Sequence, residues 1–250
     1  MKSVVEQIFH FAEEFPNKIA LLENKNEISY LKLKNNILFA KQILVETYKL
    51  DSGDCIALAA NKQLEFVYLY FAAHLLDVIA IPIDPETSLN RLDFILSKTQ
   101  PKLIVGFYNY CGQYLLSDFS IFTCNCVVVD NNVTFPSLDA IADIVFTTGT
   151  TGQPKGVKLT HLNITSSAHN INSFIQNSKN DIELLALPLS HSFGLGRLRC
   201  VLSKGATLIL LGSFVNMKRF YRLIEDFKVS GLAMVPASWA FLKKMSGNIV

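Results

Sequence analysis

Apolar residues near the start of the chain recur at helical spacing. Five of them stand three or four residues apart: Leu33, Ile37, Ala40, Leu44 and Tyr48. On a helix these side chains share one face, so the pattern predicts a long amphipathic helix. Two short apolar runs before it, 19–22 and 28–30, flank the polar segment 24–26 and predict a β-hairpin.

Short runs rich in β-branched residues then alternate with helical patterns. The runs, which we interpret as strands, cover residues 55–60, 78–83, 103–106, 126–129, 144–147, 184–187, 207–211 and 231–235. Helical patterns cover 64–76, 89–97, 195–203, 217–227 and 238–245. This alternation predicts an α/β fold with mainly parallel sheets flanked by helices. Ligands of such folds bind beyond the carboxyl ends of the strands.

Composition and charge narrow the class of protein. Half of the 250 residues are hydrophobic and 18 are Phe, which is ample for the core of a globular protein of one or two domains. The 23 basic and 21 acidic side chains leave a formal charge of +2. Such a balance argues against nucleic acid or an anionic membrane as the main partner.

Neither the N-terminal segment nor the most apolar stretch of the chain has the pattern of a signal peptide or a transmembrane helix. Glu6, Glu13 and Glu14 interrupt the segment where a signal peptide needs an apolar core. The most apolar stretch, 66–83, contains His74 and Pro82 as well as an aspartate, so we expect a buried helix and strand there, with no transmembrane segment.

The five cysteines include no CxxC pair. We therefore expect neither a disulfide framework nor a zinc site, and a cytoplasmic, reducing location. The CxC formed by Cys124 and Cys126 is interpreted as a pair of small buried residues, and no metal ligand is assigned.

The stretch FTTGTTGQPKG, residues 146–156, carries the clearest chemistry. Its glycines permit close approach of the backbone to a ligand, its threonines add hydroxyl donors, and Lys155 adds a positive charge. Crowded at the end of a predicted strand, these residues favour phosphate binding over an ordinary surface turn. The Walker pattern GxxxxGK[ST] fails at Pro154 and Gly156, and GxGxxG does not fit the spacing.

FTTGTTGQPKGV closely resembles the phosphate-binding signature [YF]TSGTTGxPKGV of the adenylate-forming superfamily, which includes acyl-CoA and aryl-CoA synthetases. Thr148 replaces the usual serine and keeps a hydroxyl. Further similarity extends along the chain, in PNKIALL, in residues 79–105, in LPLSHSFGLG at 187–196 and in GATLILL. The resemblance implies an AMP-dependent synthetase or ligase and its large N-terminal domain.

By this resemblance, the protein joins a carboxylic acid to ATP and then passes the acyl group to a thiol. The implied cofactors are ATP, Mg²⁺ and, as acceptor, CoA or the phosphopantetheine of an acyl carrier protein. The implied nucleotide-binding residues are Thr147, Thr148, Gly149, Thr150, Thr151, Gly152 and Lys155. No metal ligand is assigned to the chain, although a loop threonine could contact the Mg²⁺ that arrives with ATP.

The segment LPLSHSFGLG resembles the part of the family that lines the acyl pocket. The resemblance implies a pocket role for His191, with Phe193 and Gly194 as neighbours; the alternative is a histidine packed at a strand end. Relatives that activate amino acids usually have an aspartate here, in F-D-x-S. Its absence favours a fatty or aryl acid. His161 is expected at the start of a helix with Thr160 as N-cap, without a chemical role.

Several motifs of the family are absent from these 250 residues. They are Y-G-x-T-E, the T-G-D aspartate and the late lysine of a C-terminal lid domain. We therefore expect residues 1–250 to be a partial N-terminal AMP-binding domain, with lobes near 1–180 and 181–250 that could interleave. Such a fragment is expected to be inactive alone. The alternative is a non-catalytic nucleotide- or phosphate-binding module or an interaction subunit, and a kinase-like NTPase ranks third.

Overall fold

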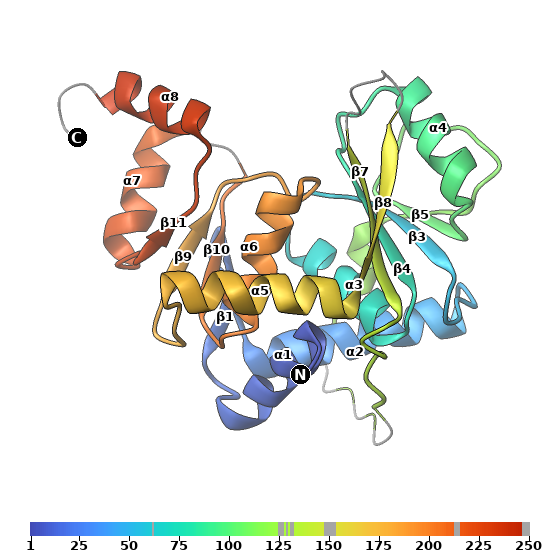
Figure 1. The fold of residues 1–250 in the computed structure, drawn as a ribbon, viewed down its shortest axis with the longest axis horizontal. Coiled ribbons are helices and arrows are strands. Elements are labelled where there is room, and N and C mark those ends of the chain that lie inside the picture. Colours follow the sequence, from blue (N-terminus) through green and yellow to red (C-terminus); the bar gives the residue numbers. More distant parts are fainter. Residues whose placement is uncertain are drawn as a thin grey trace.

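The chain forms two β-sheets that lie side by side, with helices between and around them (Figure 1). The computed structural model describes residues 1–61, 63–124, 128, 130, 133–147, 154–212 and 216–246.

The larger sheet has six strands in the described residues, in the order β6-β5-β3-β4-β7-β8. The strands are β3 (Cys55–Ala59), β4 (Ile79–Ile83), β5 (Leu103–Val105), β6 (Leu116–Ser117), β7 (Ile141–Thr147) and β8 (Lys155–Thr160). All neighbours are parallel except β7 and β8, which form an antiparallel hairpin. The central strands are apolar without alternation because both faces of a parallel sheet are covered by helices.

The smaller sheet combines the start of the chain with its later part. Its order is β11-β9-β10-β1-β2, formed by β1 (Ile19–Glu23), β2 (Asn26–Ser29), β9 (Ile182–Leu185), β10 (Thr207–Leu210) and β11 (Gly231–Leu232). The β1–β2 hairpin adds to this sheet through parallel pairing of β1 with β10, where Leu21 lies opposite Leu208.

The helices begin at recognisable caps. They are α1 (Val4–Glu14), α2 (Tyr30–Glu46), α3 (Leu64–Leu75), α4 (Leu89–Thr99), α5 (His161–Ile175), α6 (Ser192–Leu202), α7 (Met217–Asp226) and α8 (Pro236–Ser246), with a 3₁₀ helix η1 (Phe119–Phe122). The Ser29 hydroxyl, for example, accepts the backbone N–H of Lys32 at the start of α2. Among the described helices, none is both long and apolar enough to cross a bilayer.

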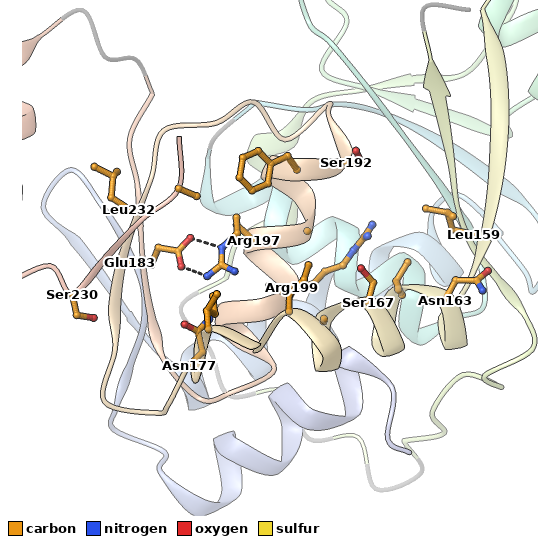
Figure 2. Close-up of a pocket in the computed structure, with 18 residues that line it drawn as sticks. Leu159, Asn163, Ser167, Asn177, Glu183, Ser192, Arg197, Arg199, Ser230 and Leu232 are labelled. Atoms are coloured by element: carbon orange, nitrogen blue, oxygen red, sulfur yellow. Dashed lines mark hydrogen bonds and ion pairs between the residues drawn. The ribbon is translucent and has the colours of Figure 1, made fainter. Parts of the chain in front are cut away.

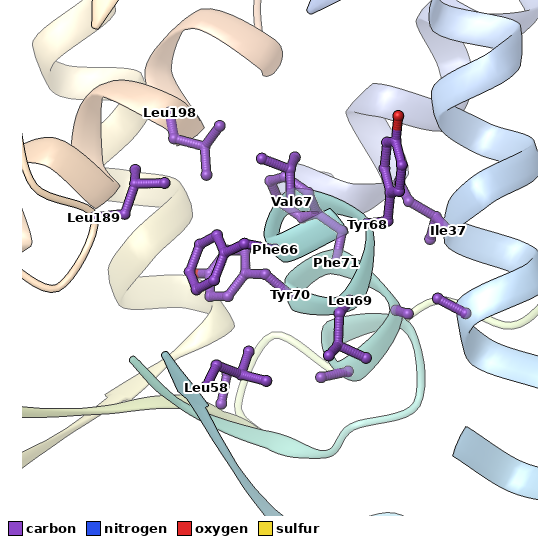
Figure 3. Close-up of a cluster of buried hydrophobic side chains, with 14 of the residues drawn as sticks. Ile37, Leu58, Phe66, Val67, Tyr68, Leu69, Tyr70, Phe71, Leu189 and Leu198 are labelled. Carbon is purple, nitrogen blue, oxygen red and sulfur yellow. The ribbon is translucent and has the colours of Figure 1, made fainter. Parts of the chain in front are cut away.

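Helix α3 lies at the centre of the core. From Phe66 to Leu75 every side chain is buried. Figure 3 shows those of residues 66–71 pointing to different sides of the helix, among Ile37 of α2, Leu58 of β3 and Leu198 of α6. A helix that is apolar on all sides is stable only inside a protein. The stretch 66–83 is therefore a buried helix followed by a buried strand, as the interrupted apolar pattern predicted.

The α/β fold class predicted from the sequence is confirmed, as are the first hairpin and the helices at α2, α3, α4, α6, α7 and α8. Besides the short strand β6 and the 3₁₀ helix η1, two longer elements were missed. Residues 4–14 form α1, and residues 155–160 form β8, whose glycine and lysine content is unusual for a strand. The strand predicted at 126–129 falls largely outside the described residues, and Val128 lies in no strand.

Candidate functional site

The hairpin of β7 and β8 brings the two ends of the predicted phosphate loop together. Thr147 ends β7 and lies opposite Lys155, the first residue of β8. The Thr147 hydroxyl donates to the Lys155 carbonyl oxygen at 3.5 Å. In the described part of the chain, the exposed Lys155 ammonium has no ion-pair partner, so it is available to an anionic ligand. Thr148, Gly149, Thr150, Thr151 and Gly152 lie outside the described residues.

Strand β8 leads directly into α5. The Thr160 hydroxyl accepts the backbone N–H of Asn163 while the Asn163 side chain accepts that of Thr160, which is a reciprocal capping box. The predicted N-cap at Thr160 is therefore confirmed. The cap fixes the direction in which the helix leaves the phosphate-loop hairpin.

A cavity of about 700 Å³ lies between α5, α6 and β11 (Figure 2). Its walls are mostly apolar: Ile164, Ala168, Ile171 and Ile175 of α5 and Leu232 of β11. Leu159 of β8 also lines the cavity, so one continuous segment runs from the phosphate loop to the cavity wall. The volume and apolar lining are typical of a small-molecule site.

The beginning of α6 supplies another part of the cavity. Ser192 and Phe193 line it, and His191 occupies the N-cap position with an exposed side chain that is not among the lining residues. A Cβ at position 194 would overlap the carbonyl oxygen of Pro188, so only glycine allows this close turn. Of the three predicted pocket residues, the structure thus places Phe193 in the cavity lining, whereas His191 and Gly194 are its neighbours in sequence and do not line the cavity.

Arg197, one turn further along α6, also lines the cavity and is buried. Its Nε donates to Glu183 Oε1 at 2.8 Å, and its Nη2 donates to Glu183 Oε2. Figure 2 shows this two-pronged pair between α6 and β9. An ion pair thus stands among the apolar and uncharged polar residues that line the chamber, which Arg199 also borders.

A second buried cluster connects the two sheets. Asp143 of β7 accepts hydrogen bonds from Arg199 of α6 and, at 3.1 Å, from the hydroxyl of Tyr70. His74 Nε2 lies 3.0 Å from its other oxygen, and Arg199 Nε donates to the Tyr70 hydroxyl at 2.9 Å. Burial alone would raise the pKa of Asp143, but the charges of Arg199 and His74 outweigh it and the pKa is lowered.

His161, the first residue of α5, packs against this cluster. Its ring lies 5.0 Å from that of His74, centroid to centroid, and its Nε2 lies 3.8 Å from Asp77 Oδ1. Burial, with the nearby positive charge of His74 second, lowers the pKa of His161 to about 3. The imidazole is therefore neutral at physiological pH, and its buried Nε2 has no hydrogen-bond partner among the described residues.

Sequence reasoning assigned no role to these charged residues. The signal was present as ionisable residues inside apolar runs: Asp143 in IADIVF, Glu183 in IELLAL, His74 in FAAHLL, and Arg197 and Arg199 in GLGRLRCVL. A buried charge needs a partner, so such positions mark buried pairs even where the partner cannot be identified.

Comparison with known proteins agrees with this architecture. The chain matches the family model for AMP-binding enzymes over residues 8–249. It therefore belongs to the AMP-binding enzyme family, the class that the signature at 146–157 resembles.

Individual relatives are distant. An oxalate–CoA ligase of Arabidopsis thaliana is 28% identical over 249 residues, covering 90% of this chain and 48% of the relative. A solved o-succinylbenzoate coenzyme A synthetase of Bacillus subtilis, in complex with AMP, has a TM-score of 0.87 at 23% identity, covering 97% of this chain and 65% of that one. The same enzyme with ATP and magnesium has a TM-score of 0.81 at 23% identity, covering 90% and 62%. The chain spans about half the length of the first curated relatives it matches.

The buried cluster predicts a large cost for removing the charge of Asp143. Asp143→Asn leaves the Arg199 guanidinium buried without a carboxylate, so we expect the free energy of unfolding to fall by about 3–5 kcal/mol. Urea denaturation measures this. The exposed Asp139→Asn, four residues earlier, serves as control and should change little. An Asp143→Asn protein as stable as the wild type would contradict the importance of the pair.

His161 predicts a stability loss in acid. Its pKa is lowered in the folded state, so the unfolded chain binds the extra proton between about pH 3 and pH 6.5 and stability decreases as pH falls through that window. We expect His161→Gln to reduce the slope of unfolding free energy against pH by up to about 1.4 kcal/mol per pH unit. His74, Asp77, Asp143 and Arg199 face this ring in both proteins. Urea unfolding at pH 4, 5 and 6 gives the slopes, and the exposed His169→Gln on the same helix should leave the slope near that of the wild type.

Proposed function

We propose that this chain supplies the phosphate loop and acid pocket of an enzyme that activates carboxylic acids as acyl adenylates and forms thioesters. The supporting observation is the β7–β8 hairpin, which holds Thr147 and Lys155 opposite each other and continues through Leu159 into the wall of an apolar cavity. Phosphate chemistry and acid binding thus belong to adjacent parts of one segment. The family match over residues 8–249 supports the same function.

In the proposed reaction, an oxygen of the acid attacks the α-phosphorus of ATP. A new P–O bond forms, the bond to the bridging oxygen breaks, and pyrophosphate leaves. A thiol of CoA or of a carrier protein then attacks the acyl carbon and AMP leaves. Both reactants of the first step are anions, so catalysis depends on positioning and charge stabilisation.

Residues of this chain are proposed to contribute to both the positioning of the reactants and the stabilisation of phosphate charge. Lys155 and the loop hydroxyls are proposed to hold the β- and γ-phosphates, and the capped start of α5 keeps the hairpin in place. Mg²⁺ bound with ATP would neutralise phosphate charge, as the magnesium-containing structure of the Bacillus subtilis synthetase suggests by analogy. His191 and Phe193 are proposed to border the acid, and the apolar walls favour a fatty or aryl body.

We also propose that residues 1–250 form part of an N-terminal AMP-binding domain. The strands near residues 19–29 pair in one sheet with strands from 182–232, which supports interleaved lobes better than a division at residue 180. The proposed acceptor thiol belongs to CoA or to phosphopantetheine.

Phosphate binding by Lys155 can be tested on the 250-residue protein. Lys155→Ala should weaken Mg·ATP binding about 10- to 100-fold, because a charge-assisted contact contributes about 1.5–3 kcal/mol. Calorimetric or ligand-observed NMR titration measures the affinity. Lys158→Ala, also exposed on β8, removes the same charge from a position outside the loop and should change the affinity much less. Equal affinities of the two variants would refute the assignment of Lys155.

Adenylate formation by the isolated 250-residue polypeptide is tested separately from its nucleotide binding. Since the Y-G-x-T-E, T-G-D and lid-lysine motifs are absent from its 250 residues, we expect no acid-dependent exchange of pyrophosphate into ATP. Radiolabelled pyrophosphate exchange with a panel of acids checks this. Measurable exchange that requires both an acid and Lys155 would show that those motifs are dispensable here.

A further inference from the structure

The Arg197–Glu183 pair stands in the apolar cavity that we assign to the acid. The side chains of Arg197 and Glu183 are only 7% and 5% exposed, and both residues line the chamber. Stability does not require such a pair, because well-packed apolar residues of similar volume are commonly as stabilising as a buried ion pair. Its position in a ligand-sized cavity indicates a role in recognition.

The pairing leaves part of the guanidinium available. Arg197 donates from Nε and Nη2 to the two oxygens of Glu183, whereas its Nη1 has no acceptor among the described residues. Arg197 is among the residues that line the cavity. The pair is neutral as a unit, yet it presents unused N–H donors to the cavity.

Arg199, two residues later, does not offer the same opportunity. It also borders the cavity and likewise donates from Nε and Nη2, but its partners Tyr70 and Asp143 are not among the residues that line the cavity. Arg197 is thus the cavity residue whose charge is balanced by a partner that itself lines the cavity.

The distance along α6 places Arg197 away from the expected reaction centre. Arg197 follows Ser192 by five residues, which corresponds to about 7 Å along a helix axis. An acid whose carboxylate lies near the start of α6 would reach Arg197 with its far end. In that orientation, the pair faces the tail of the acid.

We propose that Arg197 and Glu183 select acids whose apolar body ends in a neutral hydrogen-bond acceptor, such as a hydroxyl or amide oxygen. This inference rests on the proposed function. A plain alkyl end would cover the Arg197 donors without replacing their hydration. A second carboxylate would bring a negative charge beside Glu183, and Arg197 is already neutralised.

Four acids of matched length test the selection: heptanoic acid, 6-hydroxyhexanoic acid, hexanedioic acid and its monoamide. Their dissociation constants for the 250-residue protein are measured by ligand-observed NMR, without nucleotide. The hydroxy acid and the monoamide should bind about 10- to 100-fold more tightly than heptanoic acid and the diacid. Equal or reversed affinities would overturn the proposal, and so would failure of all four to bind.

Two variants assign the selection to this pair. Arg197→Met with Glu183→Leu removes both charges together, so it leaves no unpaired charge and should favour heptanoic acid. Glu183→Gln leaves Arg197 uncompensated and should favour the diacid. Circular dichroism and thermal unfolding confirm that each variant is folded; should Glu183→Gln unfold, the double variant alone decides. A ranking of the four acids that is the same in the double variant and the wild type would overturn the proposal.

The acid-binding experiment and the Lys155→Ala experiment can fail independently of each other. If Lys155→Ala weakens Mg·ATP binding as expected while the four acids bind equally, the selection fails and the phosphate-loop assignment stands. If the acids rank as expected but Lys155→Ala changes nothing, the acid pocket stands and the nucleotide assignment fails.

Discussion

The buried ion pair between Arg199 and Asp143, which lies between the two sheets, constrains the rest of the structure. Asp143 belongs to β7 of the larger sheet and Arg199 to α6, which packs on the smaller one. Neither charge tolerates burial alone, so each element is held where the other can satisfy it. Tyr70 and His74 of the central helix complete the hydrogen bonding, and the cluster thereby fixes three elements relative to one another.

This constraint reaches the candidate site from two directions. Strand β7 runs from Asp143 to Thr147 at the mouth of the phosphate loop, and α6 runs from Arg199 back to Ser192 at the cavity. Each path is only a few residues of regular structure. The buried pair therefore sets the separation between the proposed nucleotide and acid positions, which is the quantity on which a reaction between two bound anions depends.

Helix α6 uses its two arginines on different sides. Residues two positions apart on an α-helix are rotated by about 200°, so Arg197 and Arg199 point away from each other. Arg199 reaches β7 and Arg197 reaches Glu183 on β9. One helix thus contributes a structural pair to the sheet junction and a separate pair to the cavity, and a single-residue shift in its register would misplace both.

The sequence by itself determined the local elements and the family. Apolar spacing identified α2, and the apolar stretch with its polar breaks identified α3 and β4, because each pattern reflects interactions within one segment. The signature at 146–157 indicated the family now shown over residues 8–249.

Only the tertiary structure decided the long-range partners: that β1 pairs with β10, that His161 packs against His74, and that Arg197 meets Glu183. A lone charge in an apolar run shows that a partner must exist, but its identity depends on how distant segments fold together, and no local pattern records that.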